Sequence, residues 1–405
     1  MDILPDETPL FRYIEDVMRT QAQNYGFGEI RTPTFENTEL FVRGVGDTTD
    51  VVQKEMYTFN DRDENRSISL RPEGTASVAR ALIEHGKCSD TMPQKYYYIM
   101  NCFRHEAPQA GRSREFFQFG TETFGSDSPA ADATSIALAA SVLNKLGLTN
   151  VKLHINSIGC RECRPSYKAA LVKYFSSHEE KLCDTCRKRL QTNPLRILDC
   201  KSEICSGIAK DAPKTIEHLC AGCAEHFDSL KKRLDAMSIE YKINPSIVRG
   251  LDYYTRTVFE FIAEGIAAQS TVCGGGRYDG LVESLGGPAL SGIGFGMGIT
   301  RVILAMRQMG VANVAAPAPK VYIAALGDAA GIKSLEICER LRRADIFAEC
   351  DTMGRSLKAQ MKYANKIGAE YVLIIGDSEI ESGSAQLRNM QNGEQSEVQL
   401  DSFTI

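Results

Sequence analysis

Residues 102–124 read Cys-Phe-Arg-His-Glu-Ala-Pro-Gln-Ala-Gly-Arg-Ser-Arg-Glu-Phe-Phe-Gln-Phe-Gly-Thr-Glu-Thr-Phe and decide how the chain folds. A turn rich in Pro and Gly leads into an alternating strand, so the stretch predicts a β-hairpin. Every second side chain of a strand lies on the same face, which groups Gln118, Gly120 and Glu122. We interpret this face as a pocket floor, where the glycine leaves room for a ligand and the carboxylate receives a cation or hydrogen-bond donor.

The hairpin turn also gathers the arginines Arg104, Arg112 and Arg114. Guanidinium groups are permanently charged and fork-shaped, so arginines that converge from a turn can hold phosphate oxygens bidentately. The pattern therefore favours a polyphosphate site. A solvated hairpin with ordinary surface charges is the alternative, and this stretch alone does not decide between them.

Five further blocks occur in order along the chain. They are residues 26–35 (Gly-Phe-Gly-Glu-Ile-Arg-Thr-Pro-Thr-Phe), 70–75 (Leu-Arg-Pro-Glu-Gly-Thr), 246–260 (Ser-Ile-Val-Arg-Gly-Leu-Asp-Tyr-Tyr-Thr-Arg-Thr-Val-Phe-Glu), 273–281 (Cys-Gly-Gly-Gly-Arg-Tyr-Asp-Gly-Leu) and 292–301 (Gly-Ile-Gly-Phe-Gly-Met-Gly-Ile-Thr-Arg). Together with the hairpin they resemble the class II aminoacyl-tRNA synthetases, and within that class the histidyl-tRNA synthetase family. The resemblance extends from Asp2 nearly to the C-terminus.

The resemblance implies an α+β catalytic domain over residues 1–310, built on a six-stranded antiparallel sheet with flanking strands and helices. Hydrophobic periodicity points the same way. Residues 8–25 have helical spacing, and strand-like segments that end in turns occupy residues 29–35, 67–71, 96–103, 116–124, 258–262 and 292–297. Such an order is typical of an antiparallel sheet that carries helices.

A second, smaller domain is predicted after a linker. Residues 311–319 are rich in small residues and proline, which is typical of a linker. Beyond it, strands at 321–326, 347–350 and 371–375 alternate with helices at 329–343 and 356–367, which predicts a small α/β unit with a parallel sheet over residues 320–405. The resemblance identifies this unit as an anticodon-binding domain.

The activity that the resemblance implies is that of a histidine–tRNA ligase. The enzyme would activate L-histidine with ATP and Mg²⁺ to histidyl-adenylate, and then transfer the histidyl group to the 3′ terminal adenosine of tRNA(His). Positioning and charge stabilisation should dominate such phosphate chemistry. By resemblance, Arg104 and Arg249 hold the α-phosphate of ATP, and Arg112 and Arg301 hold the outer phosphates.

The resemblance also implies a histidine pocket. The α-amino group would be received by the loop of Glu73, Gly74 and Thr75, with Gln118 beside it. Glu122 and Tyr254 would hydrogen-bond the two imidazole nitrogens, and Tyr253 and Tyr278 would line the same pocket. A neutral imidazole has one donor and one acceptor nitrogen, so a carboxylate and a phenol complete its hydrogen bonds.

Other interpretations of these residues remain open at this point. The tyrosines are also compatible with core aromatics, the run Gly274–Gly276 with a tight turn, Glu73 with a helix cap, and Arg249 with a surface ion pair. Two rival functions also remain. One is a catalytically silent paralogue such as the regulatory subunit of ATP phosphoribosyltransferase, which lacks the C-terminal domain, and the other is an anticodon-binding accessory protein without adenylation.

Eight of the thirteen cysteines fall within residues 158–228, which we expect to be a helical insertion. Cysteines are rarely oxidised in the cytosol, and close Cys-x-x-Cys spacing is typical of zinc knuckles. We therefore predict structural zinc, either as two four-thiolate sites or as one site with leftover thiols, with reduced buried thiols as the alternative. The predicted ligands are Cys160, Cys163, Cys183, Cys186, Cys200, Cys205, Cys220 and Cys223.

Composition limits the cellular setting and the partners. The chain is 43% hydrophobic and 24% charged with a formal net charge of −5, so any RNA contact should be local. One candidate is the stripe of Arg355, Lys358, Lys362 and Lys366, for which a solvated helix face is the alternative. No apolar stretch reaches the roughly 18 residues of a membrane helix, and the N-terminus lacks a secretory pattern. We expect a cytoplasmic enzyme without membrane association, and the resemblance implies a homodimer formed through residues 26–35.

Overall fold

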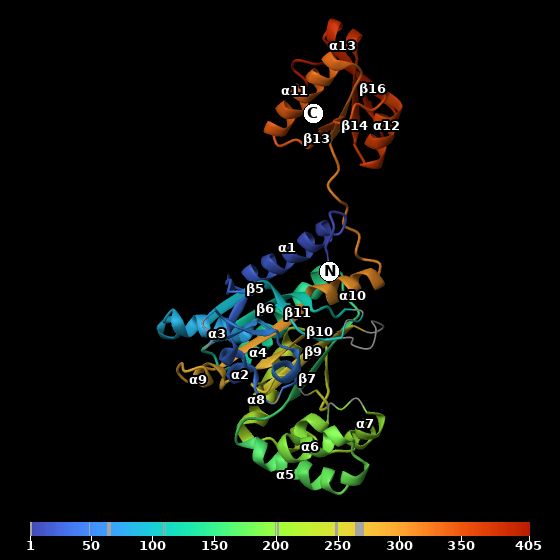
Figure 1. Cartoon of the computed structure of the whole chain (residues 1–405). Helices are drawn as coiled ribbons and strands as arrows, with labels where there is room; N and C mark the ends of the chain where they lie inside the picture. The colour runs from blue at the N-terminus through green and yellow to red at the C-terminus, as the bar shows by residue number, and fades with distance from the viewer. Residues whose placement is uncertain are drawn as a thin grey trace. The chain divides into compact units, whose positions relative to one another are not determined.

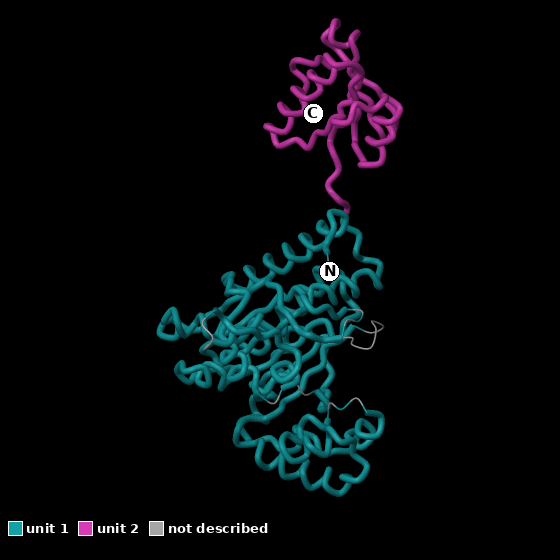
Figure 2. Tube along the Cα trace, in the orientation of Figure 1, with its two compact units in different colours: residues 1–314 teal, residues 315–405 magenta. Residues whose placement is uncertain are grey.

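The computed structural model describes residues 2–47, 49–62, 66–107, 109, 111–198, 200, 202–247, 250–263 and 271–405. The chain divides into two compact units, residues 1–314 and residues 315–405 (Figure 2). None of the described helices combines the length and the apolar character that crossing a bilayer demands.

The first unit is built on an eight-stranded sheet (Figure 1). Its strand order is β1 (Gly28–Glu29), β5 (Gln94–Phe103), β6 (Glu115–Phe124), β11 (Gly292–Gly298), β10 (Thr271–Arg277), β9 (Thr255–Ala263), β7 (Val151–Ser157) and β8 (Tyr241–Ile243). The six inner strands pair antiparallel, whereas β1 and β8 pair parallel at the edges. The predicted antiparallel sheet with flanking strands is therefore confirmed.

Helices cover the two faces of this sheet differently. On one face, α1 (Thr8–Asn24), α4 (Pro129–Lys145), α8 (Ala221–Ala236) and α10 (Ile299–Gln308) share a large apolar core with the strands. On the other face, a smaller apolar cluster joins α3 (Thr75–Glu84) and α9 (Leu281–Ser284) to Tyr98, Phe124 and Tyr278. The second face is the less densely covered one, and it carries the candidate site.

One expectation and one alternative interpretation about individual segments are wrong. Residues 29–35 do not form one strand, because only Gly28–Glu29 pairs as β1 and the chain re-enters a sheet at β2 (Phe35–Asn37), next to β4 (Ser67–Leu70) and β3 (Thr58–Asn60). Pro33 has no backbone N–H for a ladder, and the carbonyl of Pro33 instead accepts from Arg71 Nη1 at 3.0 Å. The run Gly274–Gly276 is not a tight turn but the middle of β10.

A helical insertion separates β7 from α8. It contains the helices α5 (Cys163–Ser176), α6 (Asp184–Thr192) and α7 (Glu203–Lys210), which gather away from the sheet (Figure 1). The insertion has an apolar cluster of its own that includes Tyr167, Leu171 and Phe175. The chain returns through α8, which packs against α4.

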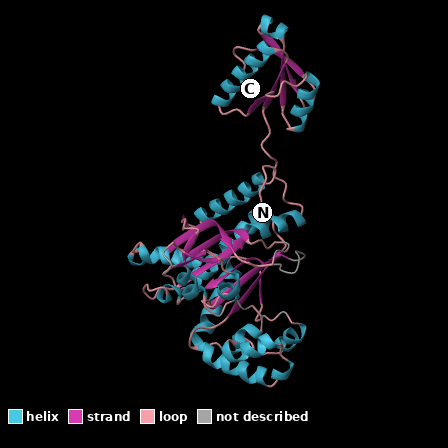
Figure 3. Cartoon of the chain, in the orientation of Figure 1, coloured by secondary structure: helices cyan, strands magenta, loops and turns pink. Residues whose placement is uncertain are grey.

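The second unit holds a five-stranded sheet in the order β13 (Ala348–Cys350), β12 (Val321–Ala325), β14 (Tyr371–Ile375), β15 (Ser384–Asn389) and β16 (Gln395–Gln399) (Figure 3). The first three strands are parallel, as predicted. An unpredicted antiparallel pair, β15 and β16, extends the sheet. Its helices are α11 (Asp328–Arg343), α12 (Leu357–Lys366) and α13 (Asp377–Ser382).

Candidate active site

Glycines on the central strands make room for a carboxylate in the middle of the sheet. Glu122 on β6 pairs with Gly294 on β11, which pairs with Gly276 on β10. A Cβ at Gly294 would lie 2.1 Å from Oε2 of Glu122 and 2.2 Å from the carbonyl oxygen of Thr121. Because the clash with the backbone cannot be relieved by a rotamer change, only glycine permits Glu122 to lie across this strand.

Three hydroxyl groups donate to the Glu122 carboxylate, which is completely buried. Oε1 accepts from Thr75 Oγ1 at 2.8 Å and from the Tyr98 hydroxyl at 3.1 Å, and Oε2 accepts from the Tyr278 hydroxyl. Burial raises the pKa of Glu122 to about 8, with a further rise from nearby Glu73, although the three donors act against the shift.

Tyr98 is a site residue that sequence reasoning missed. Its ring fills the space beside two glycines, since a Cβ at Gly120 would lie 2.2 Å from Tyr98 Cζ and a Cβ at Gly74 would lie 2.4 Å from it. The expectation that Gly120 leaves room for a ligand is therefore wrong, because that room holds Tyr98. The hairpin register offered a signal, since it places Tyr98 opposite Gly120.

The three predicted tyrosines lie together on the same face of the sheet. The ring centroid of Tyr253 lies 4.6 Å from that of Tyr254 and 5.7 Å from that of Tyr278. A Cβ at Gly276 would meet Tyr254 Cδ1 at 2.9 Å, so the Tyr254 ring lies over β10 while Glu122 lies over β11. Glu122 comes from β6 and Tyr254 from the residue before β9, and their side chains lie over the neighbouring strands β11 and β10.

The loop of Glu73, Gly74 and Thr75 begins helix α3. Glu73 is buried, and its two oxygens accept from the backbone N–H of Thr75 at 2.7 Å and of Ala76 at 2.9 Å. Glu73 therefore caps the start of α3, as the helix-cap interpretation predicted. Each carboxylate oxygen keeps a second lone pair for another donor. Burial raises the pKa of Glu73.

Gln118 lies at the other end of the β6 face. A Cβ at Gly296 would lie 1.8 Å from Gln118 Nε2, so this side chain crosses β11 as Glu122 does. Its Oε1 accepts from the thiol of Cys102 at 3.4 Å. Burial raises the pKa of that thiol to about 12, which keeps it protonated and a hydrogen-bond donor.

The predicted phosphate-binding arginines converge at the hairpin. Arg112 Nη1 lies 2.5 Å and Arg104 Nη1 4.0 Å from the carboxylate of Glu106. Arg301 at the start of α10 donates from Nε to the carbonyl oxygen of Gly111 at 3.3 Å, directly before Arg112. Arg249 lies outside the described residues.

A cavity of about 840 Å³ opens between this site and the insertion. Among its lining residues are Arg104, Arg112 and Tyr254 from the sheet domain, and the insertion contributes a further basic set, namely Arg164, Lys168, Arg189 and Arg196. Arg196 Nη2 lies 3.0 Å from Asp252 Oδ1, just before Tyr253. The insertion therefore forms one wall of the cavity that the arginines and Tyr254 face.

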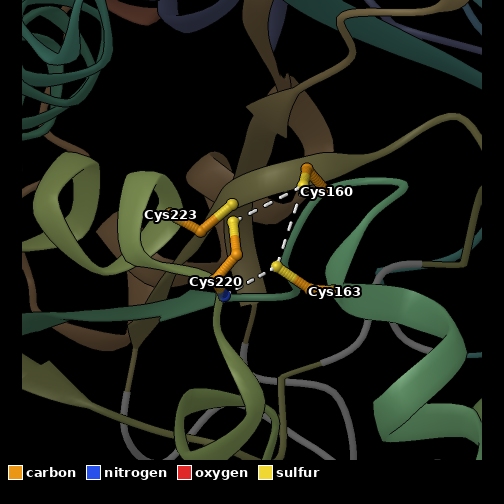
Figure 4. Close-up of side chains that lie close together, drawn as sticks. All are labelled: Cys160, Cys163, Cys220 and Cys223. Atoms are coloured by element: carbon orange, nitrogen blue, oxygen red, sulfur yellow. Dashed lines mark hydrogen bonds between the residues drawn. The ribbon is translucent and has the colours of Figure 1, made fainter.

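The eight predicted cysteine ligands form two clusters of four. The first cluster is Cys160, Cys163, Cys220 and Cys223, and the second is Cys183, Cys186, Cys200 and Cys205. In each cluster the four sulfur atoms lie within 4.8 Å of one another, and Figure 4 shows those of the first cluster turned toward a common centre.

The distances between sulfur atoms distinguish a metal site from a disulfide. The Sγ atom of Cys160 lies 3.7 Å from that of Cys163 and 3.9 Å from that of Cys220. These distances are close to the sulfur–sulfur distance of about 3.8 Å in a tetrahedral site with Zn–S bonds of about 2.3 Å. A disulfide requires about 2.05 Å. The backbone N–H of Cys220 donates to Cys163 Sγ at 3.1 Å, as suits a thiolate. This donor set fits a structural zinc ion.

Comparison with known proteins agrees with this geometry. The family model for histidyl-tRNA synthetase matches residues 1–302, and the model for an anticodon binding domain matches residues 320–404. The second match contradicts the regulatory-subunit alternative, which is expected to lack such a domain. A histidine–tRNA ligase from Caldicellulosiruptor bescii is 52% identical over 402 residues, which cover 99% of this chain and 95% of the relative.

Two other relatives agree. A histidine–tRNA ligase from Caldanaerobacter subterraneus subsp. tengcongensis is 51% identical over 400 residues, which cover 99% of this chain and 96% of the relative. The solved structure of apo S. aureus histidyl-tRNA synthetase has a TM-score of 0.84 at 37% identity and covers 99% of this chain and 96% of that one. The chain therefore belongs to the histidyl-tRNA synthetase family of class II enzymes, which activate histidine with ATP and charge tRNA with it.

Proposed function

We propose that the glycine-floored pocket selects histidine by its imidazole ring. Glu122 would accept from one ring nitrogen and Tyr254 would serve the other, with Tyr253 and Tyr278 enclosing the ring. The observation that carries this assignment is the buried Glu122 carboxylate, which three hydroxyls hold in place. An amino acid without ring N–H and N groups would leave these polar groups unpaired, which costs about 1–3 kcal/mol for each group.

The loop that begins α3 would receive the α-amino group of histidine. Glu73 carries the charge that an ammonium group needs, and its cap to Thr75 and Ala76 fixes the direction of the carboxylate. Gly74, Thr75 and Gln118 border the same place. This arrangement would leave the histidine carboxylate free to attack the α-phosphate of ATP.

The arginines would bind ATP, which enters with Mg²⁺ as part of the substrate. Arg104 and Arg249 are assigned to the α-phosphate, and Arg112 and Arg301 to the outer phosphates. Support comes from the convergence of Arg104 and Arg112 on Glu106 and from the contact of Arg301 with Gly111. MgATP would then replace Glu106 as the partner of the two guanidinium groups, and fixed positive charge would stabilise the departing pyrophosphate.

We also propose the domain boundaries and the partners. Residues 1–310 would form the catalytic domain with the insertion at 158–228, residues 311–319 the linker, and residues 320–405 the domain that reads tRNA(His). Lys358, Lys362 and Lys366 are exposed along α12 and suit an RNA backbone, whereas Arg355 is half-buried and lies 4.4 Å from the Tyr363 ring centroid. An enzyme that supplies ribosomes with histidyl-tRNA would work in the cytoplasm.

A homodimer through residues 26–35 completes the proposal. Phe35 at the end of this segment is 55% exposed, and Phe59 in the neighbouring small sheet is 46% exposed. Large apolar side chains this exposed are the kind of surface that a partner subunit covers.

Zinc is proposed for both cysteine clusters. The sulfur spacings and the Cys220 N–H donor described above support it for the first cluster. In the second cluster, the Sγ atoms of Cys183 and Cys200 lie 3.9 Å apart, and the Cys183 N–H donates to Cys205 Sγ at 3.3 Å, so two ions per chain are expected. Zinc would hold together an insertion whose helices are short and whose apolar core is small. Metal analysis of the purified protein tests this point: two zinc ions per chain are expected, and thiols that titrate freely without metal would contradict it.

Histidine-dependent exchange of pyrophosphate into ATP tests the assignments. Arg249→Ala should abolish exchange while histidine still binds, because that side chain is assigned to the phosphate alone. Glu122→Gln should raise the KM for histidine by about 10–100-fold with little change in the KM for ATP, because an amide NH2 replaces one of the oxygens that accept hydrogen bonds in the pocket. Equal effects of Glu122→Gln on both substrates would contradict the division of roles.

A further inference from the structure

Three ionisable side chains form a buried chain of contacts outside the histidine pocket. Arg277 and Asp132 have no exposed side-chain surface, and His226 is only 7% exposed. Asp132 on α4 bonds Arg277 through Nε at 3.1 Å and through Nη2, and it lies 2.7 Å from His226 Nε2 on α8. The chain therefore joins α8, α4 and the end of β10.

Each end of this chain reaches a site described above. On α8, Cys223 of the first cysteine cluster lies one helical turn before His226, so the two side chains occupy the same helix face. At the other end, Arg277 directly precedes Tyr278, whose hydroxyl donates to Glu122. Cluster and pocket are thus connected through one turn of α8, the buried contacts of His226, Asp132 and Arg277, and the peptide bond between Arg277 and Tyr278.

Arg277 is held more firmly than a core-packing role requires. Besides Asp132, it donates from Nη1 to Asp279 at 3.0 Å and to the Ser126 carbonyl at 2.8 Å, and from Nη2 to the Ser128 carbonyl at 3.2 Å. Every nitrogen of the guanidinium is therefore engaged, which fixes its direction. Burying such a charge network rarely adds stability over apolar packing, and a role in specifying one geometry accounts for it better.

The position of the Tyr278 hydroxyl depends on this anchoring. The Tyr278 backbone N–H donates to the Gly292 carbonyl at 2.8 Å, and its ring fills the space beside Gly292, where a Cβ would meet Cε2 at 2.1 Å. The ring is fitted so closely that a displacement at the end of β10 must move the hydroxyl relative to Glu122.

We propose that the first cysteine cluster sets the position of the Tyr278 hydroxyl through α8 and the His226–Asp132–Arg277 chain, so that metal at this cluster and recognition of histidine are coupled. His226, Asp132 and Arg277 are positioning residues, since none of them is assigned to a substrate. The inference rests on the proposed function, because its readout is the histidine pocket.

The test measures the KM for histidine and for ATP in pyrophosphate exchange, together with zinc content and thermal unfolding. Cys223→Ser and His226→Ala should each raise the histidine KM by about tenfold and leave the ATP KM within about twofold. His226→Gln places an amide N–H where Nε2 stands and should restore the histidine KM. Asp228→Asn, which removes an exposed carboxylate of α8 that pairs with Lys231, is the matched control.

The coupling also predicts non-additivity. The double variant of Cys223→Ser and His226→Ala should raise the histidine KM no more than about twofold beyond either single variant, because both act through one route. Cys186→Ser, which disrupts the second cluster, should lower zinc content without this selective change in histidine KM, because the second cluster lies outside the His226–Asp132–Arg277 chain and its part of the insertion reaches the site through Arg196 and Asp252 instead.

The variant Tyr278→Phe distinguishes failure of the coupling from failure of the pocket assignment. If Tyr278→Phe raises the histidine KM but Cys223→Ser and His226→Ala do not, the coupling is wrong and the pocket stands. If Tyr278→Phe leaves the histidine KM unchanged, both the pocket assignment and the coupling are wrong. Should His226→Ala and Cys223→Ser raise both KM values alike, they act by general disruption and the coupling is also wrong.

Discussion

The hydroxyl of Tyr98 donates to Oε1 of Glu122 at 3.1 Å, from a ring packed between Gly74 and Gly120. Tyr98 belongs to β5, whereas the three predicted pocket tyrosines come from segments next to β9 and β10, on the opposite side of the sheet's centre. The carboxylate is thereby held from both sides, by Tyr98 and Thr75 at Oε1 and by Tyr278 at Oε2. A buried acceptor fixed in this way needs no reorganisation when a ligand donor arrives.

Removing the Tyr98 hydroxyl should therefore weaken histidine binding without affecting ATP. Tyr98→Phe is expected to raise the histidine KM by about 5–20-fold and to lower the free energy of unfolding by about 1–2 kcal/mol, because Oε1 keeps only Thr75. Tyr97→Phe is the matched control, since that hydroxyl bonds Glu29 on the other face at 3.2 Å. Equal shifts of histidine KM in the two variants would show that the hydroxyl of Tyr98 does not position Glu122.

The raised pKa of Glu122 makes ligand-free stability depend on pH. An acid with a folded pKa of about 8, above its ordinary 4.5, binds its proton more tightly when folded. Its contribution to stability is therefore complete below about pH 4.5 and is lost as pH rises through about 8. Glu122→Gln cannot ionise, so it should flatten this dependence and exceed the wild-type protein in stability at pH 8.5 by about 1–3 kcal/mol.

Urea unfolding of both proteins without ligand at pH 6 and pH 8.5 provides the measurement. Glu240→Gln, which removes an exposed carboxylate, controls for the loss of one charge. A wild-type protein and a Glu122→Gln variant that lose stability in parallel over this range would rule out titration of Glu122 as the cause.

Local patterns predicted the strands, and long-range packing decided what fills the space between them. The alternation of Gln118, Gly120 and Glu122 placed them correctly on one face, because the side-chain period of a strand is fixed. Alternation does not reveal which side chain from a neighbouring strand enters the space at a glycine, so Tyr98 was missed. Thr75 and Tyr278 were implicated, but their shared contact with Glu122 depends on three segments folding together.

The cysteines illustrate the same limit. Close spacing identified the eight candidate ligands, yet it did not reveal which pairs combine. The structure groups the outer pairs, led by Cys160 and Cys220, and separately the inner pairs, led by Cys183 and Cys200. This nesting depends on the path of α5, α6 and α7 between them, which no local pattern determines.

The glycine floor predicts a sharp contrast between two alanine substitutions. Gly294→Ala would bring a Cβ within 2.2 Å of the Thr121 carbonyl oxygen, a contact that only backbone movement relieves. It should lower the free energy of unfolding by about 2–4 kcal/mol and abolish histidine-dependent exchange. Gly207→Ala on α7 meets nothing within 4 Å and should be neutral or stabilise by up to about 1 kcal/mol. Thermal unfolding compares the two, and a well-folded, active Gly294→Ala protein would show that the strand does not need glycine here.

An ion pair joins the insertion to the active-site loop, beside the hydrogen bond that Arg164 donates to the Tyr254 carbonyl. Arg196, on the turn between α6 and α7, donates from Nη2 to Asp252 Oδ1 at 3.0 Å and to the Gly250 carbonyl at 3.3 Å, and its side chain is 16% exposed. Gly250 and Asp252 lie between Arg249 and Tyr253, so this contact fixes the loop that carries an assigned phosphate ligand and the pocket tyrosines.

Arg196→Ala should therefore lower kcat for pyrophosphate exchange by about tenfold or more while the protein keeps its zinc and its thermal stability within about 1 kcal/mol. Arg196→Lys should recover only part of the activity, because lysine cannot hold the carboxylate and the carbonyl with a rigid fork. Arg187→Ala is the control, since Arg187 pairs with Asp184 on the exposed side of α6. If Arg196→Ala and Arg187→Ala exchange pyrophosphate at the same rate, the Arg196–Asp252 ion pair does not position the loop.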